Sequence, residues 1–474
     1  MTNKTFGFFD QYVRMVENPP FSKETINREI EIVNQSADVL IWSPNRLFSF
    51  DLVIPKTVYK PREDTDLLAK RLIQLGNGKG RKFLEIGSGS GALSVLASSL
   101  DWEVFACDIN PFAVSATRGN LEANKQRGCV VEGGVGPESF PFKEKFDLIV
   151  WNLPYISLDE QQQFLGPLED AAMLDTDEIG LDTRFVNTIM CNDLLTKDGR
   201  ALMLIDLTNL KSSYPLSHRI WDTHQFQDGE TIGIICLWHP FSDKKTKFLE
   251  RTTSTNNDLM SESLETSHIY AASQTMGKGR NGRLWYSTDK SYAGSWVIPN
   301  EFSSVPGAIQ LSAAYAVVSA LNNPNLSIKW PNDIILNGRK LGGILTESQS
   351  NSIDTKIVLG IGLNISHDGD FSDFKYSNIS EISDIDMHEL DNKLNTGISS
   401  LFEVKEGLPS PDLDFSLGQV YTLIKNFGVP IYEGELYPNF AISAEGELLL
   451  GELSITDLDS IEWIQSSNKA SSGS

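Results

Sequence analysis

Short apolar runs alternate with helical stretches between about residues 51 and 240. The apolar runs include KFLEIGS (82–88), EVFACDI (103–109), FDLIVWN (146–152) and TIGIICLW (231–238). Apolar runs of this length, separated by helical segments, are typical of a mostly parallel sheet with helices on both faces. We therefore expect an α/β domain over residues 51–240.

The pattern changes at HPFSDKKTK (239–247), where a proline and a small basic run interrupt the alternation. Beyond it lie glycine- and arginine-rich loops, a long helical run at 307–321 and β-rich blocks, and short strands and turns follow Phe427. The chain has no internal repeat. The pattern predicts a helical N-terminal segment (1–50), the α/β domain (51–240), a second domain long enough to be catalytic (248–427), a small β-barrel (428–465) and a disordered tail (466–474).

Charge is distributed unevenly over the 474 residues, whose formal net charge is −23. Residues 1–240 carry −10 and residues 351–474 carry −15, whereas residues 251–350 carry +1. A strongly negative field repels phosphate backbones, so we expect no nucleic-acid partner. The neutral window is the part of the chain where an anionic ligand meets no average repulsion.

Composition also indicates the cellular compartment in which the protein is expected. The four cysteines form no C-x-x-C pair and the six histidines have no metal-ligand spacing, so we expect neither a disulfide framework nor a structural metal site. No stretch approaches about 18 consecutive apolar residues, and the N-terminus lacks the apolar core of a secretion signal. We therefore expect a soluble, cytoplasmic protein without a membrane partner.

A glycine-rich turn follows the first apolar run. Gly87, Gly89 and Gly91 lie between a predicted strand and a predicted helix, where backbone can approach a polar ligand without interference from Cβ atoms. Asp108 ends the next strand and is placed to accept hydrogen bonds from two ribose hydroxyls. Because Gly87, Gly89 and Ala92 also satisfy G-x-G-x-x-A, this turn alone is compatible with a nicotinamide-dependent reductase.

Two further features favour another class. Glu85 lies two residues before the first glycine, and Asn152-Leu153-Pro154-Tyr155 ends the strand FDLIVW. Together they resemble a class I methyltransferase that uses S-adenosylmethionine, with N-L-P-Y as a variant of the family's N-P-P-Y. An amide or aromatic amine nitrogen is a poor nucleophile. Its N–H groups must be held by the asparagine and a neighbouring carbonyl, beside the tyrosine ring, while its lone pair faces the methyl group.

The segment VYKPREDT (58–65) narrows the resemblance to HemK-type protein glutamine methyltransferases, over about residues 50–240. In that family the segment lies over S-adenosylmethionine, and the substrate is the glutamine of the GGQ loop in peptide release factors. The resemblance implies a mostly parallel seven-stranded sheet and catalytic roles for Asn152 and Tyr155. It also implies an S-adenosylmethionine site formed by Thr65, Glu85, Gly87, Gly89, Gly91, Asp108 and Asn152.

The chain departs from the family at two positions. Gly134 stands where relatives carry an acid that contacts adenine, and Leu153 replaces a proline. One alternative is therefore a non-catalytic domain that binds S-adenosylmethionine or a partner protein. Another is methylation of nucleic-acid amines, but this chemistry usually needs a basic platform.

A series of ordered blocks begins in the neutral window. Ser254-Thr255-Asn256 follows a short strand, SQTMGKGRNGRLW occupies 273–285, and KWPND (329–333), RKLGGIL (339–345) and GIGLN (360–364) come next. A glycine-rich backbone can fold over a phosphate while ammonium and guanidinium groups neutralise it. The loop reads GKG and not GK[ST], so it is not a P-loop.

These blocks resemble biotin protein ligase over roughly residues 248–465. The family's G-R-G-R-x-G-R appears as GKGRNGR (277–283). Lipoate ligases share the fold but lack this loop and K-W-P-N-D, so biotin is the preferred substrate. The resemblance implies an α+β catalytic domain of class II synthetase type followed by an SH3-like β-barrel. It also implies that biotin and ATP, with Mg²⁺, form biotinyl-5′-AMP, and that biotin then passes to a lysine of a biotin carboxyl carrier protein.

The resemblance also assigns residues to each step. The residues implied to bind biotin are Ser254, Thr255, Asn256, Gln274, Lys278, Gly279, Arg280 and Lys340. The residues implied to bind ATP or the adenylate are Lys278, Arg280, Arg283, Trp285, Lys329, Asn332, Asp333 and Asn364. Lys340, Arg280 and Asp333 are implied to be catalytic, with Lys340 stabilising the charge that develops on the phosphate. We therefore predict a bifunctional enzyme that modifies proteins.

Lys278 keeps the charge of the family's arginine but cannot form a bidentate fork with a carboxylate or phosphate. We therefore expect Lys278→Arg to slow the dissociation of biotinyl-5′-AMP. The measurement is the release rate of labelled adenylate formed on wild type and variant. An unchanged release rate would contradict this prediction.

Overall fold

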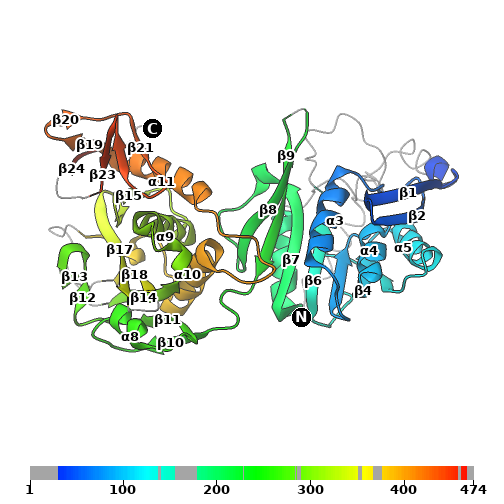
Figure 1. Ribbon diagram of the computed structural model, residues 1–474, viewed down its shortest axis with the longest axis horizontal. Helices are drawn as coiled ribbons and strands as arrows, with labels where there is room; N and C mark the ends of the chain where they lie inside the picture. Colours follow the sequence, from blue (N-terminus) through cyan, green and yellow to red (C-terminus); the bar gives the residue numbers. More distant parts are fainter. Residues whose placement is uncertain are drawn as a thin grey trace, which may run out of the picture. The chain divides into compact units, whose positions relative to one another are not determined.

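A seven-stranded sheet forms the centre of each of the two units into which the chain divides (Figure 1). Unit 1 comprises Met1–Lys211 and Ile220–Trp238, and unit 2 comprises Ser212–Arg219 and His239–Ser474. The computed structural model describes residues 30–136, 140–154, 179–227, 229–282, 284–285, 290–350, 355–366, 376–456 and 461–466. The predicted disordered tail therefore lies outside the described residues, apart from Ser466.

The sheet of unit 1 has the strand order β5-β4-β3-β6-β7-β9-β8. Strands β5, β4, β3, β6 and β7 run parallel, and β9 is antiparallel to β7. The predicted mostly parallel seven-stranded sheet is thus confirmed. Its strands are β3 (Lys82–Ile86), β4 (Glu103–Asp108), β5 (Cys129–Glu132), β6 (Phe146–Asn152), β7 (Leu195–Asp206), β8 (Ser217–Gln225) and β9 (Thr231–Trp238).

Helices connect the parallel strands of this sheet, because a parallel pair needs a crossover that a tight hairpin cannot provide. The central strands are covered on both faces, and Phe83, Leu84, Leu148 and Ile149 are fully buried. The connecting helices are α4 (Ala92–Ser99), α5 (Pro111–Ala123) and α7 (Leu181–Cys191), and α3 (Glu63–Leu75) precedes β3. Such a sheet leaves its strand ends as the places where ligands can bind.

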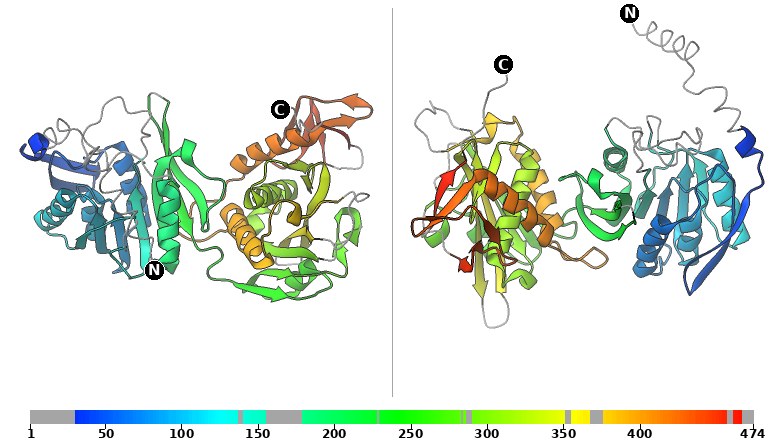
Figure 2. Two further views of the ribbon diagram at one scale, coloured as in Figure 1. Left: turned by 180° about the vertical axis from the view of Figure 1, so that it is seen from behind. Right: turned by 90° about the horizontal axis from the view of Figure 1, so that it is seen from above.

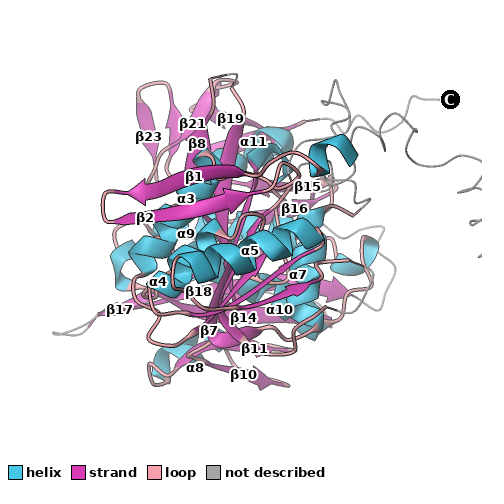
Figure 3. Cartoon of the chain, turned by 90° about the vertical axis from the view of Figure 1, so that its right-hand side faces the viewer, coloured by secondary structure: helices cyan, strands magenta, loops and turns pink. Residues whose placement is uncertain are grey.

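The expected helical segment 1–50 lies partly outside the described residues, which begin at residue 30. From Asp38 onward the expectation was wrong, because β1 (Asp38–Asn45) and β2 (Phe48–Ile54) form an antiparallel hairpin, which Figure 3 shows as two arrows beside α5. Alternate positions of β2 are buried, Leu52 and Ile54 completely. This period-two burial is the mark of a strand with one covered face, and it overrides the helical reading of the segment.

The sheet of unit 2 is mixed, with the order β10-β11-β14-β18-β17-β16-β15. Only the pair β10 and β11 is parallel. The strands are β10 (Lys245–Leu249), β11 (Thr266–Ala271), β14 (Lys290–Ile298), β15 (Leu326–Lys329), β16 (Asp333–Leu336), β17 (Arg339–Ser350) and β18 (Thr355–Ser366). This architecture agrees with the expected α+β catalytic domain.

The two faces of this sheet differ sharply, as β18 illustrates. Ile357, Leu359, Ile361 and Leu363 point into the main core of unit 2. That core also contains residues of α9 (Pro306–Leu321), α10 (Met387–Phe402) and α11 (Asp414–Phe427). Helix α9 confirms the predicted helical run at 307–321. The alternate positions of β18 face the other way, toward α8 (Thr255–Ser261), because successive strand residues point to opposite faces.

The C-terminal part of unit 2 consists of two small antiparallel sheets, drawn in orange and red near α11 in Figure 2. One has the order β20-β19-β24 and the other β21-β22-β23. The strands are β19 (Gly428–Tyr432), β20 (Glu435–Leu436), β21 (Phe440–Ile442), β22 (Leu448–Leu450), β23 (Leu453–Ile455) and β24 (Ile461–Gln465). The expected SH3-like barrel over 428–465 is not closed by hydrogen bonds among the described residues, so it stays a prediction.

None of the described helices is both long enough and apolar enough to span a bilayer.

Candidate active sites

The glycine turn of unit 1 lies where the strand order of the sheet reverses. Chain connections leave β3 toward β4 and β5 on one side, whereas β6 and β7 lie on the other. Parallel sheets bind ligands in the crevice outside the carboxyl ends of their strands at such a reversal. The turn after β3, Asp108 at the end of β4 and Asn152 at the end of β6 all belong to this edge. The tertiary structure therefore brings the predicted S-adenosylmethionine residues together.

The turn itself requires glycine. Gly87, Gly89 and Gly91 have φ values of 62°, 51° and 76°, in the left-handed region that other residues rarely adopt. A Cβ atom on Gly91 would lie 2.8 Å from the Cα of Thr117. The backbone is therefore tightly folded against α5, and the amide groups of the turn are held at the edge of the sheet.

Asp108 is held in place by this turn. Its Oδ2 accepts a hydrogen bond from the Gly89 amide and its Oδ1 from the Asn110 amide, both at 2.8 Å. Burial raises the pKa of Asp108, while the two amides act in the opposite direction. The next residue, Ile109, is 59% exposed. Sequence reasoning missed this apolar side chain beside the predicted ribose acceptor, because a single isoleucine after a strand carries no signal.

Asn152 of the N-L-P-Y motif is fixed by Asp64, a residue of the VYKPREDT segment to which sequence reasoning gave no role of its own. Its Nδ2 donates to Oδ2 of Asp64 at 2.9 Å, and the same oxygen accepts from the Tyr59 hydroxyl at 2.8 Å. Among the described residues, the buried Oδ1 of Asn152 has no hydrogen-bond partner. The amide therefore keeps one acceptor available at the carboxyl end of β6.

The other predicted residues of this site differ in what they contact. Thr65 donates to Oδ1 of Asp64 from its amide at 2.6 Å. Glu85 lies in the interior next to the turn and accepts from the Ser94 hydroxyl. Gly134, at the predicted departure from the family, lies close to Ile109, since a Cβ there would be 2.8 Å from Ile109 Cγ2. Tyr155 lies outside the described residues.

In unit 2, the segment Ser254–Asn256 begins helix α8. The Ser254 hydroxyl caps the helix by accepting from the Asn257 amide. Oε1 of Gln274 accepts from the amide of Thr255 at 2.8 Å and from its hydroxyl at 3.1 Å. All three residues of the segment are buried. The structure thus joins two blocks that are separate in the sequence into one polar cluster.

Ser295 on β14 completes this cluster. Its hydroxyl contacts Thr255 Oγ1 at 2.8 Å and Asn256 Oδ1 at 2.6 Å. Gly360 on β18 lies beneath Asn256, where a Cβ atom would approach Oδ1 to 2.3 Å. The sequence contains no motif around Ser295, so only the pairing of β14 with β18 reveals its place.

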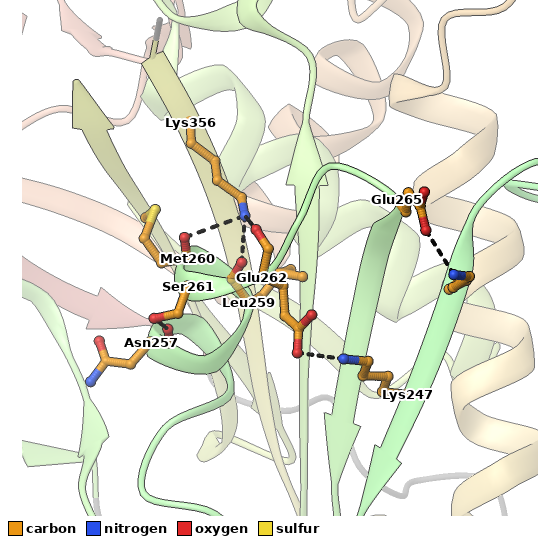
Figure 4. Close-up of polar contacts among 9 residues, drawn as sticks. Lys247, Asn257, Leu259, Met260, Ser261, Glu262, Glu265 and Lys356 are labelled. Atoms are coloured by element: carbon orange, nitrogen blue, oxygen red, sulfur yellow. Dashed lines mark hydrogen bonds and ion pairs between the residues drawn. The ribbon is translucent and has the colours of Figure 1, made fainter. Parts of the chain in front are cut away.

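Helix α8 is anchored at its other end by Lys356, as Figure 4 shows. The Lys356 ammonium donates to the carbonyls of Leu259, Met260 and Glu262 at 2.6, 3.3 and 2.8 Å. The last carbonyls of a helix lack the full set of intrahelical donors, and of these three only that of Leu259 also accepts from a backbone donor among the described residues, the Glu262 amide at 3.1 Å. A cation at this end therefore supplies hydrogen bonds to them and complements the helix dipole. Burial lowers the pKa of Lys356, and the nearby Glu262 opposes this effect.

A carboxylate connects the segment Ser254–Asn256 with the glycine-rich loop. Oε2 of Glu347 accepts from Nδ2 of Asn256 at 2.8 Å, and Oε1 lies 3.1 Å from the Lys278 ammonium. Lys278 also donates to Oδ1 of Asn257 at 2.8 Å. Sequence reasoning did not select Glu347, since an acid two positions after the RKLGGIL block gives no indication of its partner.

Trp285 covers the centre of the same face. Its ring lies over Gly343 and Gly362, where Cβ atoms would approach it to 3.3 and 3.2 Å. The Lys340 ammonium lies 5.2 Å from the ring centroid and 2.5 Å from Oδ1 of Asp333. The predicted catalytic pair and the predicted adenylate-binding tryptophan are therefore neighbours.

The remaining predicted nucleotide-binding residues lie around this centre. Nη1 of Arg280 and Oδ1 of Asn364 are buried and have no partner among the described residues. Asn332 donates from Nδ2 to the Ile344 carbonyl at 2.7 Å, and Lys329 pairs with Asp333 in the β15–β16 ladder. Gly279 lies between β12 (Gly277–Lys278) and Arg280, and Arg283 is outside the described residues.

Known proteins resemble both units. Residues 247–364 match the biotin/lipoate A/B protein ligase family, and residues 64–158 match the ribosomal protein L11 methyltransferase family. Unit 2 therefore contains a biotin-ligase-type domain, and unit 1 contains a methyltransferase-type domain. The match of residues 64–158 favours a methyltransferase over the nicotinamide-dependent reductase, which was compatible with the glycine turn alone.

Individual relatives cover parts of the chain. The biotin–[acetyl-CoA-carboxylase] ligase of Paracoccus denitrificans is 38% identical over 128 residues, 25% of this chain and 53% of that enzyme. The release factor glutamine methyltransferase of Clostridium acetobutylicum is 32% identical over 127 residues, 25% of this chain and 44% of that enzyme. A solved structure of Aquifex aeolicus biotin protein ligase with biotin and ATP has 26% identity and a TM-score of 0.36, covering 47% of this chain and 96% of that one. The chain spans about half the length of the two curated enzymes.

Burial gives Glu85 a measurable signature. It raises the pKa of Glu85 from 4.5 to about 8, although the Ser94 hydroxyl acts against this shift. Between these pH values the native carboxyl keeps a proton that the unfolded chain has released, so the free energy of unfolding falls as the pH rises. We expect Glu85→Gln to reduce this decline in unit 1, leaving the part that the raised pKa of Asp108 contributes. The measurement is hydrogen exchange of β3 and α4 peptides across this pH range.

Exposed Glu103 supplies the matched control for that experiment. Its replacement by glutamine should leave the pH dependence of β3 and α4 exchange as in wild type. If the protection of the β3 and α4 peptides from exchange in wild type did not change with pH, the prediction for Glu85 would be wrong.

Proposed function

We propose that this chain is a bifunctional protein-modifying enzyme. Unit 2 would form biotinyl-5′-AMP from biotin and ATP and transfer biotin to a lysine of a biotin carboxyl carrier domain. Unit 1 would transfer the methyl group of S-adenosylmethionine to a glutamine amide of a peptide release factor. The family matches of the two units support this division, and the relatives' names supply the two reactions.

The observation that carries the ligase proposal is the buried Nη1 of Arg280, which lacks a partner among the described residues. A buried guanidinium nitrogen without an acceptor is costly, so the site is suited to an incoming anion. Arg280 lies two residues from Lys278 and in the loop that precedes Trp285. A carboxylate or phosphate entering this face would satisfy it.

The polar cluster around Thr255 fits the head group of biotin. A ureido group has two N–H donors and one carbonyl acceptor, and it needs partners of both kinds inside an apolar pocket. The hydroxyls of Thr255 and Ser295 can donate or accept, and the Asn256 and Gln274 side chains supply amide groups beside them. These side chains would orient biotin so that its carboxylate extends toward the glycine-rich loop.

Lys340 would act at the reacting centre. In the first step the biotin carboxylate attacks the α-phosphorus of ATP, the bond to pyrophosphate breaks, and negative charge builds on the phosphate oxygens. The Lys340 ammonium would stabilise this charge, since a fixed cation in a partly dry site is effective against developing charge. In the second step the carrier lysine, as a neutral amine, attacks the acyl carbon and releases AMP. The role of the chain is then to position the groups and exclude water.

Mg²⁺ would enter with the nucleotide. It is usually held by one or two carboxylates together with phosphate oxygens. Asp333 supplies a carboxylate on the same face as Trp285 and Lys340. Asp333 would then hold the metal or keep Lys340 in position.

The methyltransferase proposal depends on the unpartnered Oδ1 of Asn152. An acceptor at this position can take a hydrogen bond from the N–H of a primary amide and aim the nitrogen lone pair at a methyl donor. The glycine turn, Asp108 and the exposed Ile109 would hold S-adenosylmethionine, which supplies an electrophilic methyl group. The net charge of −10 over residues 1–240 favours a protein acceptor over a nucleic acid.

We also propose a cytoplasmic location for this chain. All four cysteines lie within the described residues, and none forms a disulfide. Thiols that stay reduced are typical of proteins from a reducing compartment.

The ligase proposal predicts a specific effect of Lys340→Ala. We expect the rate of biotin- and ATP-dependent labelling of a carrier domain to fall by about 100- to 1,000-fold, as when a group that stabilises charge in a transition state is removed. The matched control is Lys393→Ala, because Lys393 is an exposed lysine of unit 2 that pairs with Glu389 on α10. Full activity of Lys340→Ala would contradict this role.

The methyltransferase proposal predicts labelling of a protein glutamine. Wild type with methyl-labelled S-adenosylmethionine should label an intact release factor but not its GGQ-loop Gln→Ala variant, and Asn152→Ala should abolish the label. Label found on DNA instead of the release factor would contradict the proposed acceptor.

A further inference from the structure

We propose that Asp64 is a positioning residue for methyl transfer, because it determines which atom of the Asn152 amide faces the acceptor nitrogen. This inference rests on the proposed methyltransferase function of unit 1. Asp64 makes its contact with Asn152 across 88 residues of sequence, from the first turn of α3 to the end of β6. The two residues belong to different sequence motifs, Asp64 to VYKPREDT and Asn152 to N-L-P-Y.

The contact has only one chemically sensible orientation. A carboxylate accepts hydrogen bonds and donates none, so the group of Asn152 that faces it must be the NH₂. Nδ2 of Asn152 lies 2.9 Å from Oδ2 of Asp64. The carbonyl oxygen of the same amide then points to the opposite side, where it is buried without a partner among the described residues. Asp64 thereby turns an ambiguous side chain into a dedicated acceptor.

Asp64 is itself held rigidly. It is 2% exposed, and its Oδ1 accepts from the Thr65 amide at 2.6 Å and from the Thr65 hydroxyl at 3.2 Å. Its Oδ2 accepts from the Tyr59 hydroxyl as well as from Asn152. The carboxylate also lies in the first turn of α3, where the helix dipole favours negative charge. Four donors therefore fix both oxygens in place.

The orientation decides which nucleophile can be held. A primary amide presents N–H groups, and these need an acceptor at Asn152. If the Asn152 amide were reversed, its NH₂ would face the N–H of the substrate, and two donors would oppose each other at the reacting nitrogen. The substrate would lose the hydrogen bond that orients its lone pair, so the rate of transfer would fall. S-adenosylmethionine binding would change little.

The test replaces Asp64 with asparagine. The new amide can keep its oxygen toward the Thr65 amide and present its NH₂ to Asn152, which then reverses. We expect kcat for methylation of release factor to fall by about 100-fold, the usual cost of a misplaced reacting group, while the Kd for S-adenosylmethionine stays within about twofold. The control is Asp101→Asn, which removes the same charge at an exposed turn with φ 62°, a conformation that asparagine tolerates.

A reciprocal exchange separates orientation from structural damage. In Asp64→Asn/Asn152→Asp, the amide at 64 donates to the carboxylate at 152, whose other oxygen still accepts from the substrate. Asn152→Asp alone places two carboxylates against each other. We expect the double variant to exceed both single variants by about tenfold in kcat, as one recovered charge-assisted hydrogen bond would give.

The outcomes are distinguishable. A wild type that binds S-adenosylmethionine but methylates no release factor overturns the proposed function and with it the role of Asp64. An active wild type whose Asp64→Asn variant keeps its kcat overturns only the positioning role. A double variant no better than the singles, with both singles folded by circular dichroism, also overturns it.

Discussion

The alternation of side chains along a β-strand is the constraint on which the candidate ligase site depends. On β18, Leu359, Ile361 and Leu363 point into the core, so the residues between them must face the other side of the sheet. Those residues are Gly360 and Gly362, and Asn364 follows on the same face. The apolar side chains fill one face of the strand. On the other face the two glycines have no side chains, so Asn256 and Trp285 can lie directly on the sheet. The core and the site are thus two sides of the same strand.

Unit 1 meets the same constraint in a different way. Its central parallel strands are covered on both faces, so neither face can hold a ligand. The functional groups are therefore at the carboxyl ends of the strands, in the turn after β3, at Asp108 and at Asn152. A mixed sheet with one face covered by the main core and the other carrying α8 and Trp285, and a parallel sheet with two covered faces, lead to sites in different places, although each sheet has seven strands.

A carboxylate orients an asparagine amide in both units, a buried one in unit 1 and a half-buried one in unit 2. Asp64 accepts from Nδ2 of Asn152, and Glu347 accepts from Nδ2 of Asn256. In each case the NH₂ group is taken up within the protein, and the amide oxygen is directed elsewhere. An amide has two chemically different ends of similar shape, so a carboxylate is an effective way to fix which end faces a ligand. Sequence reasoning gave Asp64 no role beyond membership of the VYKPREDT segment, and it did not indicate Glu347 at all, because the role of each carboxylate depends on the partner that folding brings to it.

The sequence by itself determined the class of each domain. The GSGSG turn, N-L-P-Y, GKGRNGR and K-W-P-N-D are local patterns whose chemistry is set by residues close together in the chain, and the period of apolar residues indicated the parallel sheet and α9. The hairpin at 38–54 was missed because its short alternating strands resemble other amphipathic segments. Only the tertiary structure joined Asp64 to Asn152, Ser295 to Thr255, Glu347 to Lys278 and Lys356 to the end of α8. These contacts link elements distant in sequence, and their geometry follows from strand register and helix packing, which no local pattern contains.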